Sequence, residues 1–392
     1  MNNTDINKDK KANKRPEIPT KVRLQVWSAA AGRCSFRGCN KKLWYDGLTL
    51  SSGNFGELAH IIGVKEKGPR GNSDSESLVK NPSNIMLVCQ EHHKMLDDNP
   101  QTYTVGIIRK MKAEHEYRIN QVTSITAECK TEILVFKANI GKRSVEVDFV
   151  EAKRTIIGLG FYPASNEGIL IDRTREEGDG EDAHWQYNRE KIEKDMARLI
   201  ELKGNLQNPI THLSVFALGP IPYLMLLGKL LTDTQINKIE VFQRDRSAQS
   251  WEWPTNIDLD NLPKYQFEAP IKTNSSCEPV LILALSDHIK SDKYEGIFSS
   301  EQDIYTITLK DAIPNREYCQ HPSLVTDFVK LFHQTINELQ SIYGVKTKLH
   351  LLSAIPNSVA VRCGMALLPK KEMPILVYDF NHDYGFRPIF LI

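Results

Sequence analysis

Residues 89–97 read CQEHHKMLD and follow the apolar run Ile85 to Val88. Within them Cys89 and His92 are separated by two residues, and upstream Cys34 and Cys39 are separated by four. Close pairs of cysteine and histidine are typical of tetrahedral structural zinc sites, which hold small domains together. The sequence therefore predicts one Zn²⁺ bound by Cys34, Cys39, Cys89 and His92. The alternative is that these are ordinary reduced cysteines.

Three other polar residues of the same window lie beside expected strands and helices. His60 follows a short apolar run, Asn84 precedes the run Ile85 to Val88, and His93 begins an expected helix. This succession of strand, loop, strand and helix resembles the HNH endonuclease family, which has a ββα-metal fold. Its chemistry, hydrolysis of a phosphodiester, needs a base that is largely neutral near pH 7 and a divalent cation.

The resemblance implies a catalytic set of His60, Asn84 and His93. His60 is the expected general base, Asn84 is expected to orient it through hydrogen bonds, and His93 is the expected ligand of a catalytic Mg²⁺. Many family members carry an acidic ligand directly before the first histidine, where this chain has Ala59. Asp97 would share a helix face with His93 and is the candidate second magnesium ligand. The alternative is a degenerate domain that keeps the zinc and holds DNA without cutting it.

Composition sets the outer limits of the interpretation. The length of 392 residues predicts two or three domains, and 41% hydrophobic and 25% charged residues are typical of a soluble globular chain. The net charge of +1 gives no overall sign of nucleic-acid binding, so any DNA surface must be local. No apolar run has the length of a membrane span, and the N-terminus has no secretory hydrophobic region, so a cytoplasmic location is expected.

Changes in composition predict four regions of the chain. Residues 1–19 are polar and lysine-rich and are expected to be a disordered basic arm, 20–122 form the nuclease domain, 123–131 are a polar linker, and 132–392 form a second domain. Within the first domain, residues 63–80 are rich in Gly, Ser and charge. They are predicted to be a loop, either lying along a DNA duplex or without a ligand.

The second domain contains an internal repeat. Residues from Ser214 align with those from His350 without a gap, so that Pro220 matches Pro356 and Gly228 matches Gly364. Each copy reads as an apolar strand, a turn with proline, a helix and another apolar strand. Duplicated βαβ units predict parallel sheets with helices on both faces, and a ligand site beyond the carboxyl ends of the strands.

Side chains at these strand ends are the candidate ligand-binding residues. Arginines after a strand end can pair with phosphates, and tryptophans can stack on a base; the alternative is solvated arginines and tryptophans packed between units. Trp253 is the alternative to Trp251 for stacking. The predicted set is Pro220, Tyr223, Gln243, Arg244, Arg246, Trp251, Ala354, Ile355, Pro356 and Asp379.

This second domain resembles the SAVED domain, a fusion of two CARF-like, Rossmann-like units that binds cyclic oligonucleotides. The likeness rests on the strand, proline and helix units at 214–231 and 350–367, and on VFQ at 241–243 followed by WEW at 251–253. Together the two resemblances imply a bacterial CBASS anti-phage effector. A cyclic di- or trinucleotide would activate it to cut double-stranded DNA, with assembly into homo-oligomers, expected to be tetramers. A ligand-independent restriction endonuclease and a non-catalytic, zinc-containing DNA-binding regulator are the alternatives.

Overall fold

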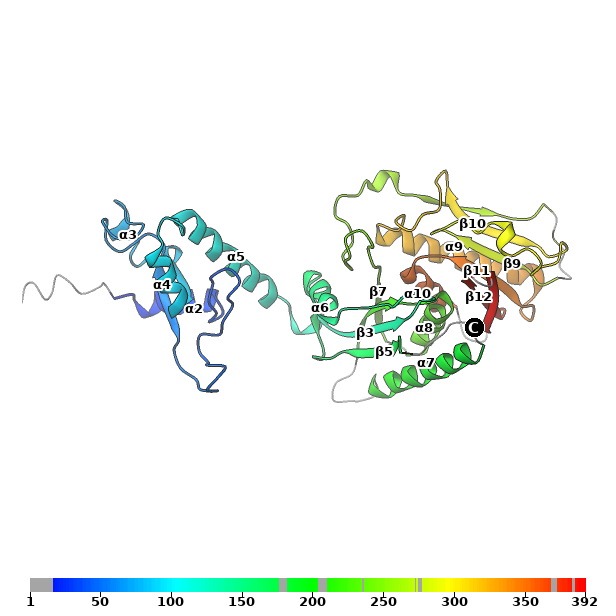
Figure 1. Ribbon diagram of the computed structural model, residues 1–392, viewed down its shortest axis with the longest axis horizontal. Helices are drawn as coiled ribbons and strands as arrows, with labels where there is room; N and C mark the ends of the chain where they lie inside the picture. The colour runs from blue at the N-terminus through cyan, green and yellow to red at the C-terminus, as the bar shows by residue number, and fades with distance from the viewer. Residues whose placement is uncertain are drawn as a thin grey trace, which may run out of the picture. The chain divides into compact units, whose positions relative to one another are not determined.

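The computed structural model describes residues 17–175, 182–203, 210–234, 236–271, 273, 277–367, 372–382 and 385–392. It divides into two compact units, Met1–Thr126 and Ala127–Ile392 (Figure 1). The division falls inside the predicted linker 123–131, but helix α5 (Val105–Thr123) ends at the first residue of that segment and strand β3 (Lys130–Ala138) begins before its end. Most of the predicted basic arm, residues 1–16, lies outside the described residues.

The N-terminal unit is built on a two-stranded antiparallel sheet, β1 (Gly56–His60) with β2 (Ile85–Cys89). All five residues of β2 are buried, as expected of an apolar run, and α4 (Gln90–Asp98) follows directly. The unit's other elements are α2 (Thr20–Ala29), α3 (Ser75–Leu78), the short 3₁₀ helix η1 (Pro82–Asn84) and α5. Val26, Leu43, Leu96 and Ile108 pack with β2 in one small core.

The first half of the C-terminal unit is a parallel sheet. Strand β3 pairs with β6 (His212–Leu218) on one side and with β4 (Tyr162–Pro163) and β5 (Ile169–Arg173) on the other, and β6 pairs with β7 (Lys238–Phe242). Its helices are α6 (Phe149–Gly158), α7 (Asp182–Lys203) and α8 (Ile221–Asp233). A short 3₁₀ helix, η2 (Ala127–Cys129), precedes β3.

The second half is a sheet of six strands in the order β13-β12-β11-β9-β10-β8. The four inner strands, β9 (Val280–Ala284), β10 (Ile304–Lys310), β11 (Leu349–Ala354) and β12 (Ile375–Asn381), are parallel. The edge strands β8 (Lys264–Glu268) and β13 (Gly385–Leu391) are antiparallel to their neighbours. Its helices are α9 (Pro322–Tyr343) and α10 (Asn357–Ala366), with the 3₁₀ turns η3 (Leu259–Asn261) and η4 (Ser291–Lys293).

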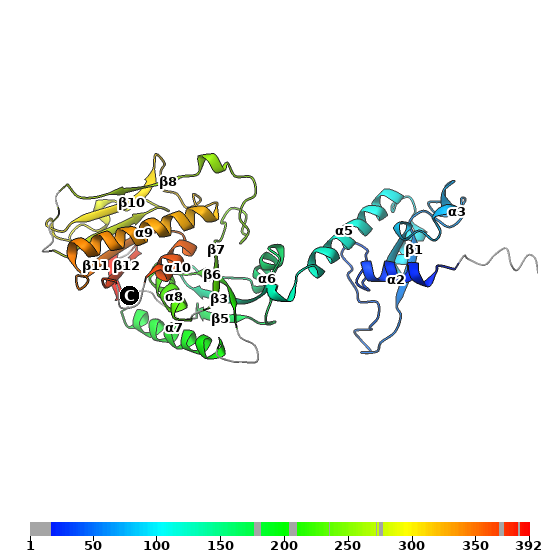
Figure 2. The ribbon, with the colours of Figure 1, turned by 180° about the vertical axis from the view of Figure 1, so that it is seen from behind.

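The predicted repeat corresponds to β6-α8-β7 in the first half and β11-α10-β12 in the second. Helices α8 and α10 lie side by side in both views of the ribbon (Figures 1 and 2). The main hydrophobic cluster takes residues from both halves, including Phe136 and Leu224 from the first and Phe328 and Val361 from the second. The two halves therefore share one core. No helix of the described residues is long and apolar enough to cross a bilayer.

Candidate functional site

The predicted zinc ligands come together in the N-terminal unit. Cys34 and Cys39 lie in the loop after α2, Cys89 ends β2, and His92 is in the first turn of α4. The four ligand atoms all lie within 4.8 Å of one another. The Nδ1 atom of His92 is 3.0 Å from Cys89 Sγ and 3.6 Å from Cys34 Sγ. Three thiols and one imidazole gathered this closely are a donor set that tetrahedral zinc uses, so the residues fit the ion.

The surroundings of this cluster suit a structural ion rather than a catalytic one. Cys34 and Cys89 are buried, and burial raises the pKa of the Cys34 thiol to about 12. The ring of Phe36 stacks on that of His92 with 4.0 Å between their centroids. A bound cation would favour the thiolates that burial otherwise disfavours, and the closed set of four ligands leaves no position for a substrate.

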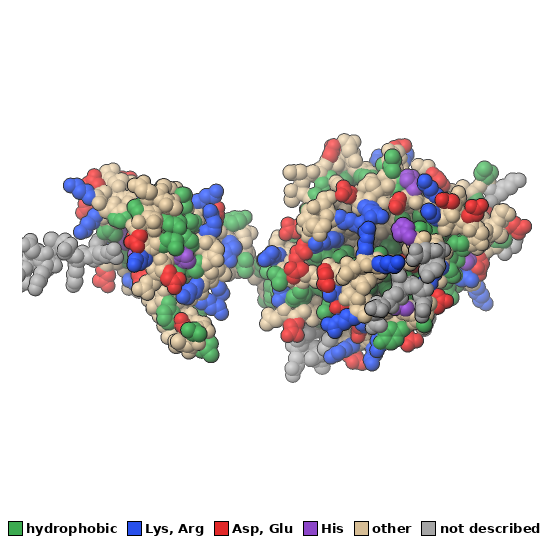
Figure 3. Space-filling view, in the orientation of Figure 1, with side chains coloured by type: hydrophobic (Ala, Val, Ile, Leu, Met, Phe, Trp, Pro, Cys, Tyr) green, Lys and Arg blue, Asp and Glu red, His purple; other side chains and the backbone are tan. Residues whose placement is uncertain are grey.

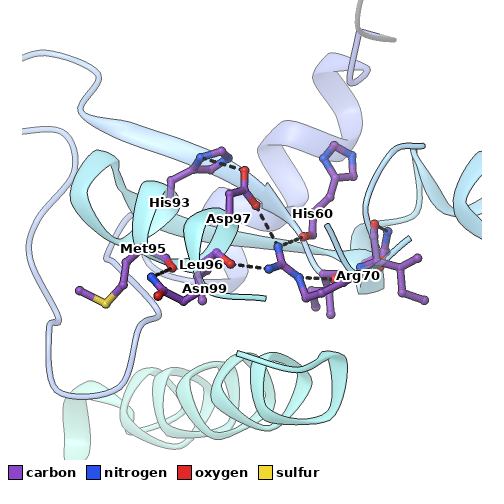
Figure 4. Close-up of polar contacts among 10 residues, drawn as sticks. His60, Arg70, His93, Met95, Leu96, Asp97 and Asn99 are labelled. Atoms are coloured by element: carbon purple, nitrogen blue, oxygen red, sulfur yellow. Dashed lines mark hydrogen bonds and ion pairs between the residues drawn. The ribbon is translucent and has the colours of Figure 1, made fainter. Parts of the chain in front are cut away.

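His60 ends β1, and its ring is fixed by one hydrogen bond. Its Nε2 atom is 3.0 Å from the backbone oxygen of Val79. A carbonyl oxygen only accepts, so Nε2 carries the proton and Nδ1 of the neutral ring keeps its lone pair. This geometry gives His60 a proton-accepting nitrogen whose identity is set by the fold. The side chains of His60 and His93 lie on the same side of Arg70 in the view of Figure 4.

Asn84, the last residue of η1, is buried, but its amide does not bond to the ring of His60. Its Oδ1 accepts from the backbone N–H of Ile62 at 2.8 Å, and its Nδ2 donates to the Ile62 carbonyl at 3.0 Å. The Asn84 side chain therefore holds the backbone two residues after His60. The ring of His60 is hydrogen-bonded to the carbonyl of Val79, and the orienting role that the family resemblance implied for Asn84 stays a prediction.

Asp97 lies one helical turn after His93 on α4, and the two side chains approach each other. Asp97 Oδ2 is 3.8 Å from His93 Nδ1, while Asp97 Oδ1 accepts a hydrogen bond from Arg70 at 2.9 Å (Figure 4). In the described part of the chain, Cys34, Cys39, Cys89 and His92 form the one cluster of three or more potential metal ligands. His93 and Asp97 thus offer two donor atoms. One carboxylate and one imidazole are few ligands, so a divalent cation held there would complete its coordination with waters and with oxygens of a phosphate substrate.

The C-terminal unit has a cleft at the carboxyl ends of its strands. Its cavity of about 250 Å³ is lined by residues after β3, β7, β9 and β10 and by the start of α10. Four of the predicted ligand residues, Gln243, Arg244, Arg246 and Pro356, are among the lining residues. A smaller neighbouring cavity shares Gln243, Arg244, Arg246 and Arg316 with it. We call this pair of cavities the arginine cleft.

The larger cavity of the arginine cleft carries excess positive charge, because three arginines, Arg244, Arg246 and Arg316, line it with one carboxylate, Glu146. Arg246 and Arg316 line both cavities, and among the described residues neither takes part in an ion pair. Partial burial and the nearby charges of Arg316 and Arg143 lower the pKa of Arg246. Arg244 differs, because it is paired with Glu151 at 2.6 Å. Figure 3 shows Lys and Arg side chains gathered beside a hollow in the face of this unit. Unpaired arginines in a concave site favour an anionic ligand.

Six of the predicted ligand residues do not line the arginine cleft: Pro220, Tyr223, Trp251, Ala354, Ile355 and Asp379. Tyr223 is buried, with its ring 4.6 Å from that of Trp185. Trp251 is also buried, edge-on to Phe216. The tryptophan that faces the cleft is Trp253. The side chains of Tyr223 and Trp251 are part of the hydrophobic core, because α8 and the loop after β7 direct them into the interior.

The other four predicted ligand residues outside the cleft also make contacts within the fold. The backbone oxygen of Ala354 accepts from Leu285 and Ser286, and Ile355 is part of the core. Asp379 lies opposite Arg387 in the β12–β13 ladder. Pro220 is buried at the start of α8. The start of α8 therefore does not open into the arginine cleft, whereas the start of α10 does.

Arg316 is the main cleft residue that the sequence pattern did not reveal. It follows the carboxyl end of β10, and Ser286, another lining residue, follows that of β9. The rule that directed attention to Gln243 and Pro356 would have found both, had it been applied to every strand of the second half.

Comparison with known proteins bears on the C-terminal unit. Residues 192–392, just over half of the chain, match the family model described as SAVED, the SMODS-associated and fused to various effectors sensor domain. No curated protein matches this chain. Among solved structures, the Acinetobacter baumannii Cap4 SAVED/CARF-domain containing receptor is similar to it in two complexes. The complex with the cyclic trinucleotide 3'3'3'-cAAA has a TM-score of 0.44 and 12% identity, covering 82% of this chain and 67% of that chain.

The complex of the same receptor with 2'3'3'-cAAA has a TM-score of 0.43 and 13% identity, covering 82% of this chain and 66% of that chain. The Moraxella osloensis Cap4 SAVED/CARF-domain containing receptor has a TM-score of 0.36 and 12% identity, covering 82% of this chain and 66% of its own. The family match is independent of these three likenesses. On the extent of that match, the chain belongs to the SAVED family.

Proposed function

We propose that this protein is a cyclic-oligonucleotide-activated, metal-dependent endonuclease that cuts double-stranded DNA as an effector of bacterial CBASS defence. The observation that carries the catalytic part is the hydrogen bond from His60 Nε2 to the carbonyl of Val79, which leaves Nδ1 as the proton acceptor. The sensor part rests on membership of the SAVED sensor family and on the unpaired arginines of the cleft.

The arginine cleft suits a ligand with several phosphates. Arg246 and Arg316 come from the first and second halves of the C-terminal unit, and both line the two cavities. A ligand that places phosphates between them relieves the repulsion of like charges and draws the two halves together. Trp253, in the smaller cavity, offers an aromatic surface to a base. A cyclic di- or trinucleotide has both features.

The N-terminal unit suits hydrolysis of a phosphodiester. His60 Nδ1 accepts a proton from the attacking water, and the carbonyl of Val79 stabilises the imidazolium that results by accepting from Nε2–H. A divalent cation at His93 and Asp97 would neutralise charge on the phosphate and on the leaving oxygen. Asn84 keeps the backbone after His60 in place, and the zinc ligands Cys34, Cys39, Cys89 and His92 hold the unit together.

The joining of these two units has a physical rationale. A nuclease without sequence preference would damage the host genome if it were always active, so its resting state must be off. We propose that the cyclic oligonucleotide drives assembly of the SAVED unit, into tetramers as the family resemblance implies, and brings nuclease units together on the duplex.

The direct test is plasmid cleavage in Mg²⁺ with a panel of cyclic di- and trinucleotides and a lane without ligand. Cutting with one ligand alone would support the proposal and identify the signal. Cutting in the lane without ligand would favour a ligand-independent restriction endonuclease. DNA binding without cutting, at saturating ligand in the cleft, would favour a non-catalytic regulator.

A further inference from the structure

Arg70 is a buried arginine at the centre of the candidate nuclease site. Its side chain is 3% exposed, and it donates to four groups. Nε donates to the Ile61 carbonyl at 2.9 Å, one terminal nitrogen donates to the Leu96 carbonyl, and the other donates to the His60 carbonyl at 3.3 Å and to Asp97 Oδ1 at 2.9 Å. Arg70 therefore joins the end of β1, which carries His60, to helix α4, which carries Asp97 (Figure 4).

Arg70 lies on a compact loop between β1 and α3. Gly63 and Gly71 close the loop so tightly that a Cβ at Gly63 would lie 2.3 Å from the Pro69 carbonyl oxygen, and one at Gly71 would lie 2.1 Å from that of Lys65. Arg70 itself has a φ of +57°, a left-handed conformation that costs a non-glycine residue free energy. The predicted loop 63–80 is thus folded inward at Arg70, so this arginine is not available to a DNA backbone.

Arg70 and His93 face different oxygens of the Asp97 carboxylate. Oδ1 is held by Arg70, and Oδ2 is turned toward His93 at 3.8 Å. A carboxylate has lone pairs for both partners, so the ion pair does not prevent Oδ2 from binding a cation. A guanidinium matches this task because its rigid fork reaches a carboxylate and several carbonyls at once, which the single ammonium of a lysine does not.

We propose that Arg70 is a positioning residue, which holds Asp97 so that Oδ2 and His93 form a two-ligand site for a divalent cation. This inference rests on the proposed nuclease function, and it explains how a chain with Ala59 before its first histidine supplies an acidic ligand. The buried guanidinium of Arg70 sets the orientation of Asp97, and it ties α4 to β1, the strand that carries the proposed general base.

The experiment measures Mn²⁺ binding by the zinc-loaded, full-length protein, using electron paramagnetic resonance of free Mn²⁺ without DNA or nucleotide. Arg70→Gln and Arg70→Lys should weaken Mn²⁺ binding by about 10-fold or more, as loss of a partner to a metal ligand does. Lys67→Gln is the matched control, because it removes one positive charge from an exposed side chain of the same loop. It should bind Mn²⁺ as the wild type does, and zinc content should be unchanged in all three variants.

A second comparison separates positioning from folding. In an Asp97→Asn background, adding Arg70→Gln should cause no further loss of Mn²⁺ binding, because Arg70 acts through Asp97. Wild-type Mn²⁺ binding by both single Arg70 variants would overturn the proposal, and so would loss of zinc from both, since Arg70 would then be needed for folding. If the wild-type protein binds Mn²⁺ through Asp97 but cuts no DNA with any ligand, the proposed nuclease function is wrong. The role of Arg70 in positioning Asp97 would still hold.

Discussion

Gly228 on α8 and Gly364 on α10 each press against the backbone of the helix that carries the other. A Cβ at Gly228 would lie 2.0 Å from the carbonyl oxygen of Val361, and one at Gly364 would lie 2.1 Å from that of Met225. Met225 and Val361 are themselves equivalent positions of the repeat, as are the two glycines. The contact is therefore made twice, once by each copy, about a local two-fold relationship between the halves.

Replacement of either glycine by alanine should destabilise the C-terminal unit. The added Cβ meets backbone atoms that do not rotate away, and overpacking of this kind costs about 1 to 3 kcal/mol. The free energy of unfolding, from urea denaturation followed by near-ultraviolet circular dichroism, measures the effect. Gly158→Ala is the matched control, since that helical glycine has as its nearest neighbour a Glu252 oxygen at 3.9 Å. Equal stability of Gly228→Ala and Gly158→Ala would contradict the close helix contact.

Removal of Arg246 or Arg316 should weaken binding of the activating cyclic oligonucleotide. A charged hydrogen bond contributes about 1.5 to 3 kcal/mol, so each alanine variant should lose about 10- to 100-fold in affinity. Isothermal titration calorimetry with the nucleotide found by the cleavage panel measures this. Arg198→Ala removes an exposed arginine of α7, away from the cleft, and should bind as the wild type does. Undiminished binding by Arg246→Ala and Arg316→Ala together would place the ligand elsewhere.

His60→Ala should abolish DNA cleavage without affecting zinc or nucleotide binding. Loss of a general base typically costs about 10²- to 10⁴-fold in rate. Single-turnover plasmid cleavage at saturating ligand and Mg²⁺ gives the rate, with metal analysis and calorimetry on the same sample. His288→Ala, which removes an exposed histidine of the C-terminal unit, is the control. Cleavage at the wild-type rate by His60→Ala would rule out His60 as the base.

Cys89→Ser should release the zinc and unfold the N-terminal unit while the C-terminal unit still binds nucleotide. The cluster connects the loop after α2 to the start of α4, and structural zinc supplies about 10 kcal/mol or more to such domains. Zinc content and two-step thermal unfolding measure the change. Cys129→Ser, outside the cluster, should keep its zinc. Full zinc content in Cys89→Ser would exclude this ligand set.

His212 should make the stability of the C-terminal unit fall as pH is lowered. Burial first, and then the charge of Lys238, lower the pKa of His212, while Glu240 acts in the opposite direction. The unfolded histidine, with a pKa of about 6.5, then binds more protons than the folded one, so the free energy of unfolding decreases as pH falls below that value. Urea denaturation between pH 7.5 and about 5.5 should show a shallower decrease for His212→Gln. An identical slope would contradict the assignment.

The sequence predicted what depends on spacing and periodicity. The cluster of Cys34, Cys39, Cys89 and His92 was predicted because pairs of Cys and His at such short separations are typical of zinc sites, and the four side-chain donor atoms lie together. Pro220, Pro356, Gly228 and Gly364 revealed the repeat because a turn and a close helix contact tolerate few other residues. The carboxyl-end rule located the cleft through Gln243, Arg246 and Pro356.

What the sequence did not predict depends on the direction of single side chains. Tyr223 is in the first turn of α8, but its face of the helix is covered by Trp185. Arg70 bonds mainly to backbone carbonyls at the end of β1 and on α4, which it reaches from a left-handed turn that no local sequence pattern predicts. The choice between Trp251 and Trp253 depended on which way the loop after β7 turns, and this follows from packing against Phe216.

The shared core of the C-terminal unit also bears on what the two halves are to each other. Gln243, at the end of β7, accepts a hydrogen bond from the Ser358 hydroxyl on α10 at 2.6 Å, and both halves contribute to the same hydrophobic cluster. Expressed as two polypeptides, the halves would bury the same apolar faces against each other and reassemble as a heterodimer. The arginine cleft would then exist only in the pair, with Arg246 in one chain and Arg316 in the other.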